Sequence, residues 1–153
     1  MDNKPAPSPA TAGKLMTEKL ETINRLNTAQ EAAMKMADRN VSSLAVVDDE
    51  GKAMGIVTER DLARRICTTN KSCDNVTVEE IMSAPVITIK PDESLETAAR
   101  YMVQKRVRHL VVTDDVDQPI GIITATDFTE YLNENDELDE VIRQILREHA
   151  RYE

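Results

Sequence analysis

The chain repeats itself with a constant shift of 66 residues, as from Met16 to Met82, and the match needs no gap. Its clearest part is the pattern Gly-Ile-x-Thr-x-x-Asp, which begins at Gly55 and again at Gly121. One copy of about fifty residues is too small to bury its apolar face alone. The two copies should therefore pack around a shared core and form one compact unit.

Both copies predict the same order of secondary structure. An apolar run comes first, and a helical pattern follows it, opened in the first copy by the capping box Thr28-x-x-Glu31. Two strands separated by a turn come next, and a short helix begins near Asp61 or Asp127. The strands are expected at 20–23, 44–47 and 54–58 in the first copy, and at 86–89, 110–113 and 120–124 in the second.

The predicted fold class is therefore α+β, with two tandem β-α-β-β-α repeats of small sheets faced by helices. Residues 1–13 are rich in Pro, Ala and Ser and should form a disordered tail. The repeats are expected at 14–72 and 73–135, and an amphipathic C-terminal helix at 136–153. Its apolar stripe must be buried, either on its own domain or on another subunit. The stripe consists of Leu138, Val141, Ile142, Ile145 and Leu146.

The charge of the chain limits its partners. The formal net charge is -9 at pH 7, so broad binding to nucleic acid or to an anionic membrane is not expected. An anionic small ligand would need a local cationic pocket. Cys67 and Cys73 have no neighbouring His, and they suggest free thiols rather than a zinc site. With no long apolar run and no signal-peptide core, the sequence predicts a cytoplasmic protein.

Four segments of the sequence resemble the CBS domain family. They are GIVTERDLARRI and GIITATDFTEYL, with VSSLAVVD and VRHLVVTD before them. The entry MSAPVITIKPDESLETAARYM is also typical of this family, and the resemblance covers about residues 14–133 in tandem, as in a CBS pair or Bateman module. It implies two units packed through their sheets with two clefts between them, and pairing of two chains into a homodimer. It also implies adenosine-type ligands (AMP, ADP, ATP or S-adenosylmethionine), no required cofactor, and no catalysis by the module.

The pattern Gly-x-x-Thr-x-x-Asp lies where a strand runs into a helix, and its chemistry suits a nucleotide. The first N–H groups of a helix attract anions, a Thr hydroxyl can donate to phosphate or ribose, and an ionised Asp accepts from ribose hydroxyls. The resemblance implies ligand contacts at Thr58, Asp61, Thr124 and Asp127. Thr-x-x-Asp is also a helix capping box that needs no ligand, and both roles can coexist in one pair.

The two copies differ in positive charge. The second copy has Arg108 and His109 before its strand, whereas the first has Ser42 and Ser43. The resemblance implies that the first two residues face phosphates, and the guanidinium fork suits phosphate oxygens. The alternative is that these cations are the solvated end of a helix. We expect unequal affinities in the two clefts, with Arg60 placed to reach a second phosphate.

The adenine slot should be apolar. By family position we assign Thr22 and Ile87 to it, together with Met82 and Met16, although methionine at such places is more often core filler. No catalytic constellation is present: neither histidine accompanies a recognisable nucleophile motif, and there is no Walker loop and no G-x-G-x-x-G.

The function predicted from the sequence is a regulatory module that binds an adenosine nucleotide and signals to an unknown partner protein. The alternative is a constitutive interaction or oligomerisation module whose clefts stay unoccupied. The intact Thr and Asp in both copies favour the first function, and the apolar stripe at 138–146 favours the second.

Overall fold

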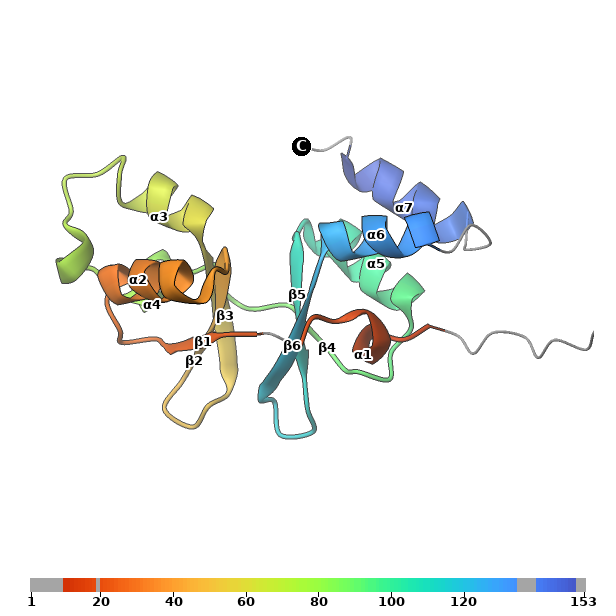
Figure 1. The fold of residues 1–153 in the computed structure, drawn as a ribbon, viewed down its shortest axis with the longest axis horizontal. Coiled ribbons are helices and arrows are strands. Elements are labelled where there is room, and N and C mark those ends of the chain that lie inside the picture. Colours follow the sequence, from red (N-terminus) through yellow and green to blue (C-terminus); the bar gives the residue numbers. More distant parts are fainter. Residues whose placement is uncertain (1–9, 19, 135–139, 151–153) are drawn as a thin grey trace, which may run out of the picture.

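The computed structural model describes residues 10–18, 20–134 and 140–150. Two halves lie side by side, each with a three-stranded sheet and helices on its outer face (Figure 1). The first half holds β1 (Thr22–Asn24), α2 (Ala29–Arg39), β2 (Ser43–Val47), β3 (Ala53–Thr58) and α3 (Glu59–Arg65). The second holds β4 (Thr88–Ile89), α5 (Leu95–Lys105), β5 (His109–Thr113), β6 (Pro119–Thr124) and α6 (Ala125–Glu134). The predicted order β-α-β-β-α is confirmed in both copies.

The two sheets have the same topology. β1 runs parallel to β2, which pairs antiparallel with β3, and β4, β5 and β6 repeat this arrangement. A parallel pair needs a crossover connection, and α2 and α5 supply it. The remaining elements of the described chain are α1 (Ala12–Leu15), the 3-10 turn η1 (Cys73–Asn75), α4 (Val78–Ile81) and α7 (Glu140–Ala150).

The alternation of side chains along β2 and β5 explains the layers. Leu44 and Val46 are fully buried in the core under the helices of the first half, whereas Ala45 is fully buried outside that core. Successive strand residues point to opposite faces, so Ala45 faces the other half. Val111 holds the same place in β5. The two repeats are therefore packed through their sheets, with the helices outside.

The residue that ends α2 and the one that ends α5 direct the chain toward the interface between the halves. Asn40 and Arg106 close these helices with φ of 53° and 54°, in the left-handed region. At the start of α2, Thr28 Oγ1 accepts from the Glu31 N–H at 3.1 Å, as predicted. The Glu31 carboxylate accepts from the Asn27 side chain, so the second half of the predicted box is not formed there.

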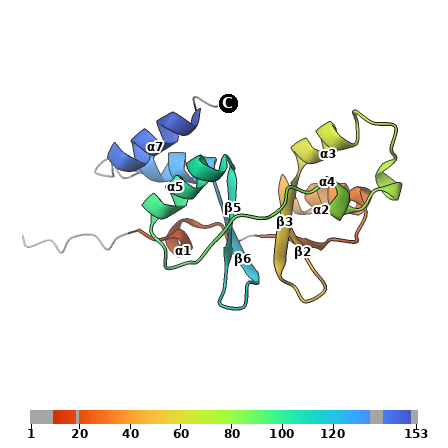
Figure 2. The same ribbon diagram turned by 180° about the vertical axis from the view of Figure 1, so that it is seen from behind.

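Each repeat is completed by the segment that precedes the other copy. Ala12 is fully buried in the second core and its N–H donates to the Glu93 carbonyl at 2.8 Å. Farther along, Thr17 forms an isolated bridge with Ile122 of β6. In the same way α4 packs in the first core, and Ser83 forms a bridge with Ile56 of β3. Figures 1 and 2 both show α1 beside the second sheet and α4 beside α2.

This exchange shows how the chain near the predicted boundaries is packed. Of the tail predicted at 1–13, residues 10–13 pack on the second repeat, while 1–9 lie outside the described residues. The limits predicted at 14 and 73 stay predictions for the sequence repeats, and the packing crosses them, since 10–17 complete the second half and 76–83 the first. The physical reason is that small side chains such as Ala12, which composition reads as a tail, fit against the other half.

The glycines of the repeated pattern make room for the exchanged segments. A Cβ on Gly55 would lie 2.7 Å from Met82 Sδ and 2.8 Å from the Ser83 carbonyl oxygen. A Cβ on Gly121 would meet the side chain of Met16, with its Cγ at 2.9 Å. Glycine is therefore required at both positions by close approach.

The C-terminal helix α7 packs on its own chain. Ile142 is 1% exposed and belongs to the second core, and Ile145 packs against that core. Figure 1 shows α7 beside α5. Leu138 and the side chains of Val141, Leu146 and His149 lie outside the described residues. Within the described part of the chain, no helix has both the length and the apolar character needed to span a bilayer.

Candidate functional site

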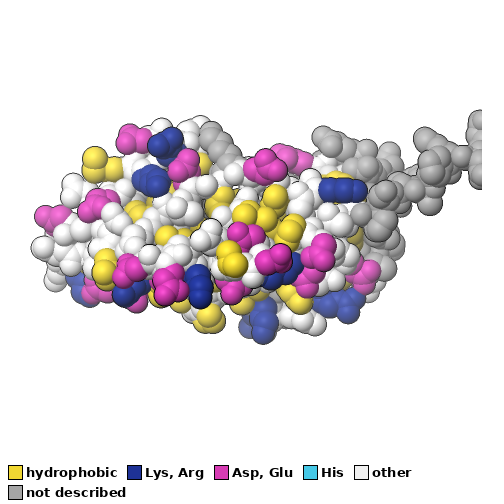
Figure 3. All heavy atoms as spheres, turned by 90° about the horizontal axis from the view of Figure 1, so that it is seen from below, with side chains coloured by type: hydrophobic (Ala, Val, Ile, Leu, Met, Phe, Trp, Pro, Cys, Tyr) yellow, Lys and Arg dark blue, Asp and Glu magenta, His cyan; other side chains and the backbone are white. Residues whose placement is uncertain are grey.

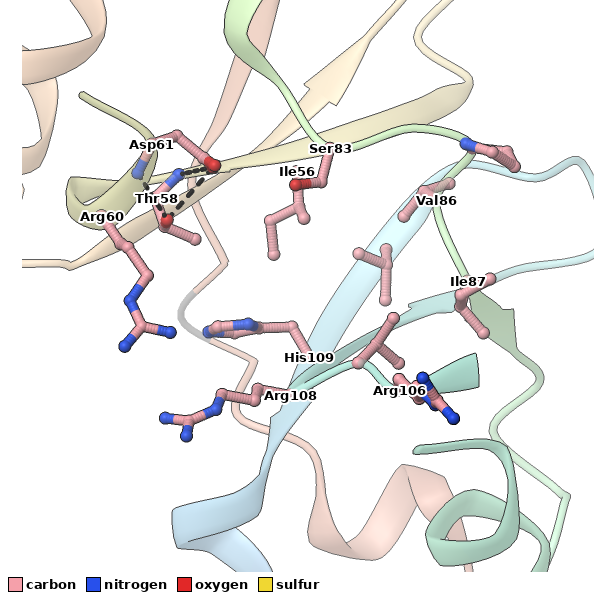
Figure 4. A pocket seen from close by; sticks show the side chains of 13 residues that line it. Ile56, Thr58, Arg60, Asp61, Ser83, Val86, Ile87, Arg106, Arg108 and His109 are labelled. Atoms are coloured by element: carbon pink, nitrogen blue, oxygen red, sulfur yellow. Dashed lines mark hydrogen bonds between the residues drawn. The ribbon is translucent and has the colours of Figure 1, made fainter. Parts of the chain in front are cut away.

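Two pockets lie where the repeats meet, and each is built from both repeats. The first, here called the arginine pocket, has a volume of about 220 Å³ (Figure 4). Ile56, Thr58, Arg60 and Asp61 line it from the first repeat, and Ser83, Pro85, Val86, Ile87, Arg106, Val107, Arg108, His109 and Val111 from the second. The second, here called the acidic pocket, has a volume of about 240 Å³. Its lining is Thr17, Leu20, Glu21, Asn40, Val41, Ser42 and Ser43 from the first repeat, with Ile122, Thr124 and Asp127 from the second.

In the Thr-x-x-Asp motif, hydrogen bonds from the threonine hold the aspartate carboxylate in place at the N-terminus of a helix. Asp61 Oδ2 accepts from the Thr58 N–H at 2.9 Å and from the Thr58 hydroxyl at 3.1 Å. In return, the Asp61 N–H donates to Thr58 Oγ1 at 3.2 Å, which closes a capping box at the start of α3. Asp127 Oδ2 accepts from the Thr124 N–H at 2.7 Å and its hydroxyl at 3.2 Å.

The cap leaves acceptor capacity for a ligand. An ionised carboxylate offers about four lone-pair positions, and the hydrogen bonds from Thr58 use only one of the two oxygens of Asp61. The other oxygen, Oδ1, lies 3.8 Å from Nε of Arg65. Capping and the acceptance of a ribose hydroxyl are therefore compatible in the same residue.

Cationic side chains converge on the arginine pocket from both repeats. In Figure 4, Arg60 enters from α3, while Arg108 and His109 come from the start of β5 on the opposite side. Arg106 also lines this pocket, but in Figure 4 its side chain lies at the end near Ile87, away from Asp61. The pocket is thus locally positive in a chain of net charge -9. This is the condition for an anionic ligand stated above.

The surroundings of His109 favour its neutral form. Burial lowers the pKa of its imidazole, and the neighbouring Arg108 lowers it further, while Asp61 and Asp127 act in the opposite direction. A neutral imidazole carries one donor and one acceptor nitrogen. His109 can therefore donate one hydrogen bond to a ligand near neutral pH, and a phosphate would favour its protonation.

The acidic pocket has the same frame with a different charge. Asn40, Ser42 and Ser43 stand where the other pocket has Arg106, Arg108 and His109, and no Lys, Arg or His is among the described residues that line it. Glu21 and Asp127 contribute carboxylates. Glu21 Oε2 lies 3.9 Å from Nζ of Lys35, a residue of α2 outside the pocket lining.

The structure brings most of the predicted site residues together in two groups. Thr58, Arg60, Asp61, Ile87, Arg108 and His109 line the arginine pocket, and Ser42, Thr124 and Asp127 line the acidic one. Their proposed contacts with a ligand stay predictions. The sequence did not predict that each Thr-x-x-Asp motif faces residues of the other repeat that precede or begin its strands, such as Arg108 and His109 opposite Asp61.

Three predicted residues line neither pocket. Met16 and Met82 pack against Gly121 and Gly55, as the core-filler alternative required. Thr22 lies in β1 as the register partner of Ala45. The equivalent of Ile87 under the 66-residue shift is Glu21, which lines the acidic pocket, so the ligand contact of Thr22 stays a prediction. That shift would have identified Glu21, and sequence reasoning also missed Arg106 and Val86.

Comparison with protein families is in line with this geometry. The model of the CBS domain family matches residues 12–68 and 78–134. Protein MK0525 of Methanopyrus kandleri is 35% identical over 76% of this chain, which spans 60% of that protein's length. The L-aspartate semialdehyde sulfurtransferase of Methanocaldococcus jannaschii is 33% identical over 84% of this chain, which spans 24% of its length. The chain thus covers only part of these relatives.

A solved structure has the same fold and holds ligands. The CBS domain pair of protein MJ0100 superposes with a TM-score of 0.72 at 29% identity, over 83% of this chain and 98% of that one. It was crystallised in complex with 5′-methylthioadenosine and S-adenosyl-L-methionine. Both of those ligands contain adenosine.

Proposed function

This chain belongs to the CBS domain family, and we propose that it is a regulatory module that binds adenosine nucleotides between its two repeats. It signals to a partner protein through a ligand-dependent change of conformation or affinity. The observation that carries the proposal is the arginine pocket. There Asp61, an acceptor suited to ribose, faces Arg108 and His109, donors suited to phosphate.

The lining of the arginine pocket supports a phosphorylated ligand. Arg108 and Arg60 enter from opposite sides, which suits a chain of one to three phosphates, as in AMP, ADP or ATP. Ile56, Val86 and Ile87 offer apolar surface for the adenine ring. The adenosine ligands of the MJ0100 domain pair support the same class of ligand. We propose binding without chemistry, and no cofactor is required.

Regulation follows from the position of the pockets between the repeats. A ligand shifts a conformational equilibrium only if it binds one state more tightly than the other. Because each pocket takes residues from both repeats, a ligand that contacts both favours the arrangement in which they lie close. We propose that this arrangement, in a cytoplasmic homodimer, is what the partner protein recognises. Light scattering measures the oligomeric state, and a mass of one chain contradicts the homodimer.

The first test is thermal unfolding with and without AMP, ADP, ATP and S-adenosylmethionine. A ligand at about 100 times its Kd adds about 2.7 kcal/mol to the free energy of unfolding, and this raises the Tm by several degrees. Adenosine-free phosphates such as inorganic pyrophosphate are the control for unspecific anion binding. If no adenosine ligand raises the Tm, the proposal is wrong.

The alternative function is a constitutive interaction or oligomerisation module, which the apolar stripe at 138–146 favours. Ile142 and Ile145 of this stripe are packed on the second core, which supports the first proposal, while Leu138 and the side chains of Val141 and Leu146 lie outside the described residues. The basic side chains on the face seen in Figure 3 lie scattered among Asp and Glu, as expected for a chain of net charge -9.

A further inference from the structure

The two pockets share one frame but differ in charge. We infer that the acidic pocket takes an adenosine derivative that carries no phosphate and whose 5′ substituent is uncharged or cationic. Adenosine is the uncharged example of this class, and S-adenosylmethionine is a cationic one. This inference rests on the proposed function and divides its ligands between the two pockets.

The shared frame argues for the same nucleoside in both pockets. Asp127 Oδ2 accepts hydrogen bonds from the N–H and the hydroxyl of Thr124, as Asp61 Oδ2 does from those of Thr58. Apolar residues occupy equivalent places in both linings. They are Leu20, Val41 and Ile122 in the acidic pocket, and Val86, Val107 and Ile56 in the arginine pocket.

The exchanged residues argue against a phosphate. Ser42 and Ser43 take the places of Arg108 and His109. A serine hydroxyl can donate a hydrogen bond, but it supplies no charge to balance a phosphate. Among the described residues that line the acidic pocket, none therefore supplies a charged donor for the group that the arginine pocket is built to hold.

One additional carboxylate strengthens the same discrimination. Glu21 stands where the arginine pocket has Ile87, whereas Asp127 has its counterpart in Asp61. Ionised carboxylates only accept hydrogen bonds, so they suit ribose hydroxyls, an amino group or a positive charge, and they repel phosphate. Lys35, at 3.9 Å from Glu21, offsets part of this charge from outside the lining.

Calorimetric titration of the full chain with AMP, adenosine and S-adenosylmethionine tests the division. We expect AMP to fill one site per chain, and we expect protein saturated with AMP to bind one further adenosine or S-adenosylmethionine. Ser42→Arg combined with Ser43→His should create a second AMP site and weaken the binding of S-adenosylmethionine about tenfold or more. Ser42→Ala combined with Ser43→Ala is the matched control, which changes the same positions without adding charge.

The outcomes separate this inference from the proposed function. Two AMP sites of equal affinity in the unaltered chain contradict the division of ligands, although the proposed function then stands. The same holds if AMP binds but the AMP-saturated chain takes up neither adenosine nor S-adenosylmethionine. If no adenosine ligand binds at all, both are wrong. A drop in S-adenosylmethionine affinity after Glu21→Gln, with adenosine affinity unchanged, supports the role of the carboxylate.

Discussion

Ser43 of β2 is the register partner of Thr58 of β3, and yet the two residues line different pockets. His109 and Thr124 stand in the same relationship in the other sheet. Each pocket is thus joined to the other by a pair of neighbouring strands. The pKa of His109 responds to both Asp61 and Asp127, one from each pocket. A ligand that displaces either strand pair therefore acts on both pockets.

Arg108→Ala should separate phosphorylated ligands from adenosine itself. A hydrogen bond to a charged group contributes about 1.5–3 kcal/mol, so AMP should bind about tenfold more weakly or worse, with adenosine nearly unchanged. Calorimetric titration measures both affinities. Arg100→Ala is the control, because Arg100 forms an exposed ion pair with Glu96 on α5. Equal weakening of AMP and adenosine would contradict the phosphate assignment.

Asp61→Ala should weaken ligand binding beyond its effect on stability. The variant loses a capping interaction, which costs about 1 kcal/mol in the unliganded chain. The matched control is Glu80→Ala, because Thr77 and Glu80 form the same capping box and lie outside both pockets. The hydrogen bonds from the Thr77 backbone and hydroxyl lower the pKa of Glu80, as a formed cap requires.

Thermal unfolding and AMP titration of both variants distinguish the roles of this motif. Asp61→Ala should lower both the Tm and the AMP affinity, whereas Glu80→Ala should lower the Tm alone. If AMP binds to Asp61→Ala as it binds to Glu80→Ala, then Asp61 is only a cap.

His109 should make stability depend on pH. Burial and Arg108 hold the pKa of the folded chain's imidazole below the ordinary value of 6.5, so the unfolded chain binds the proton first as pH falls. The free energy of unfolding should therefore decrease from about pH 6.5 downward to the lowered pKa, with no contribution from His109 above that window. Denaturant unfolding of His109→Gln over the same range should show a shallower decrease. Parallel profiles would contradict this role.

The same residue should link AMP binding to pH. A bound phosphate raises the pKa of His109, so AMP binding and protonation of His109 favour each other. As the pH falls from about 7.5 to about 5.5, the ratio of the AMP affinity of the unaltered chain to that of His109→Gln should therefore increase. The phosphate itself titrates near pH 6, and the ratio of the two affinities removes that effect. A ratio that is independent of pH would show that His109 does not face the phosphate.

Gly55→Ala should destabilise the chain more than Gly121→Ala. Overpacking costs about 1–3 kcal/mol, and it costs least where a flexible side chain can move away. At Gly121 the three nearest atoms all belong to the Met16 side chain, whereas at Gly55 the Ser83 carbonyl oxygen is also within 2.8 Å. Met16→Ala should therefore rescue part of the loss in Gly121→Ala, and Met82→Ala should rescue less in Gly55→Ala. Denaturant unfolding measures the free energy of unfolding of the two glycine variants and of the two double variants. If Met16→Ala and Met82→Ala restore equal shares of the lost stability, the explanation by close contacts is wrong.

Ile142→Ala should test the packing of the C-terminal helix. Truncating a fully buried isoleucine costs about 2–5 kcal/mol in the free energy of unfolding. The exposed Gln144 of the same helix provides the control variant Gln144→Ala. If the two variants unfold alike, α7 does not contribute its apolar face to the second core.

The sequence predicts the elements well because local patterns determine them. The continuous apolar run Leu44, Ala45 and Val46 is typical of a strand that is buried on both faces, and the 66-residue shift predicts the same strand in the second copy. The capping of α3 by Thr58 and Asp61 was also visible in the spacing.

The composition of each pocket could not be read from local patterns, because it depends on how the halves face each other. Nothing near Thr58 indicates that Arg108, from the other repeat, lies across the same pocket. Thr22 was assigned by family position, whereas the 66-residue shift makes Glu21 the equivalent of Ile87, and Glu21 lines the acidic pocket. The acidic character of the second pocket was missed with it.

The exchanged segments have a consequence for the order in which the chain folds during synthesis. Met16 emerges from the ribosome early and cannot pack against Gly121 until that residue has been synthesised. The first core likewise stays incomplete until Val78 and Ile81 have been added to the chain. Contacts of such long sequence separation form late and slow the search for the native state. A nick between the repeats would leave two fragments, each holding a piece of the other's core, that regain their structure only by associating.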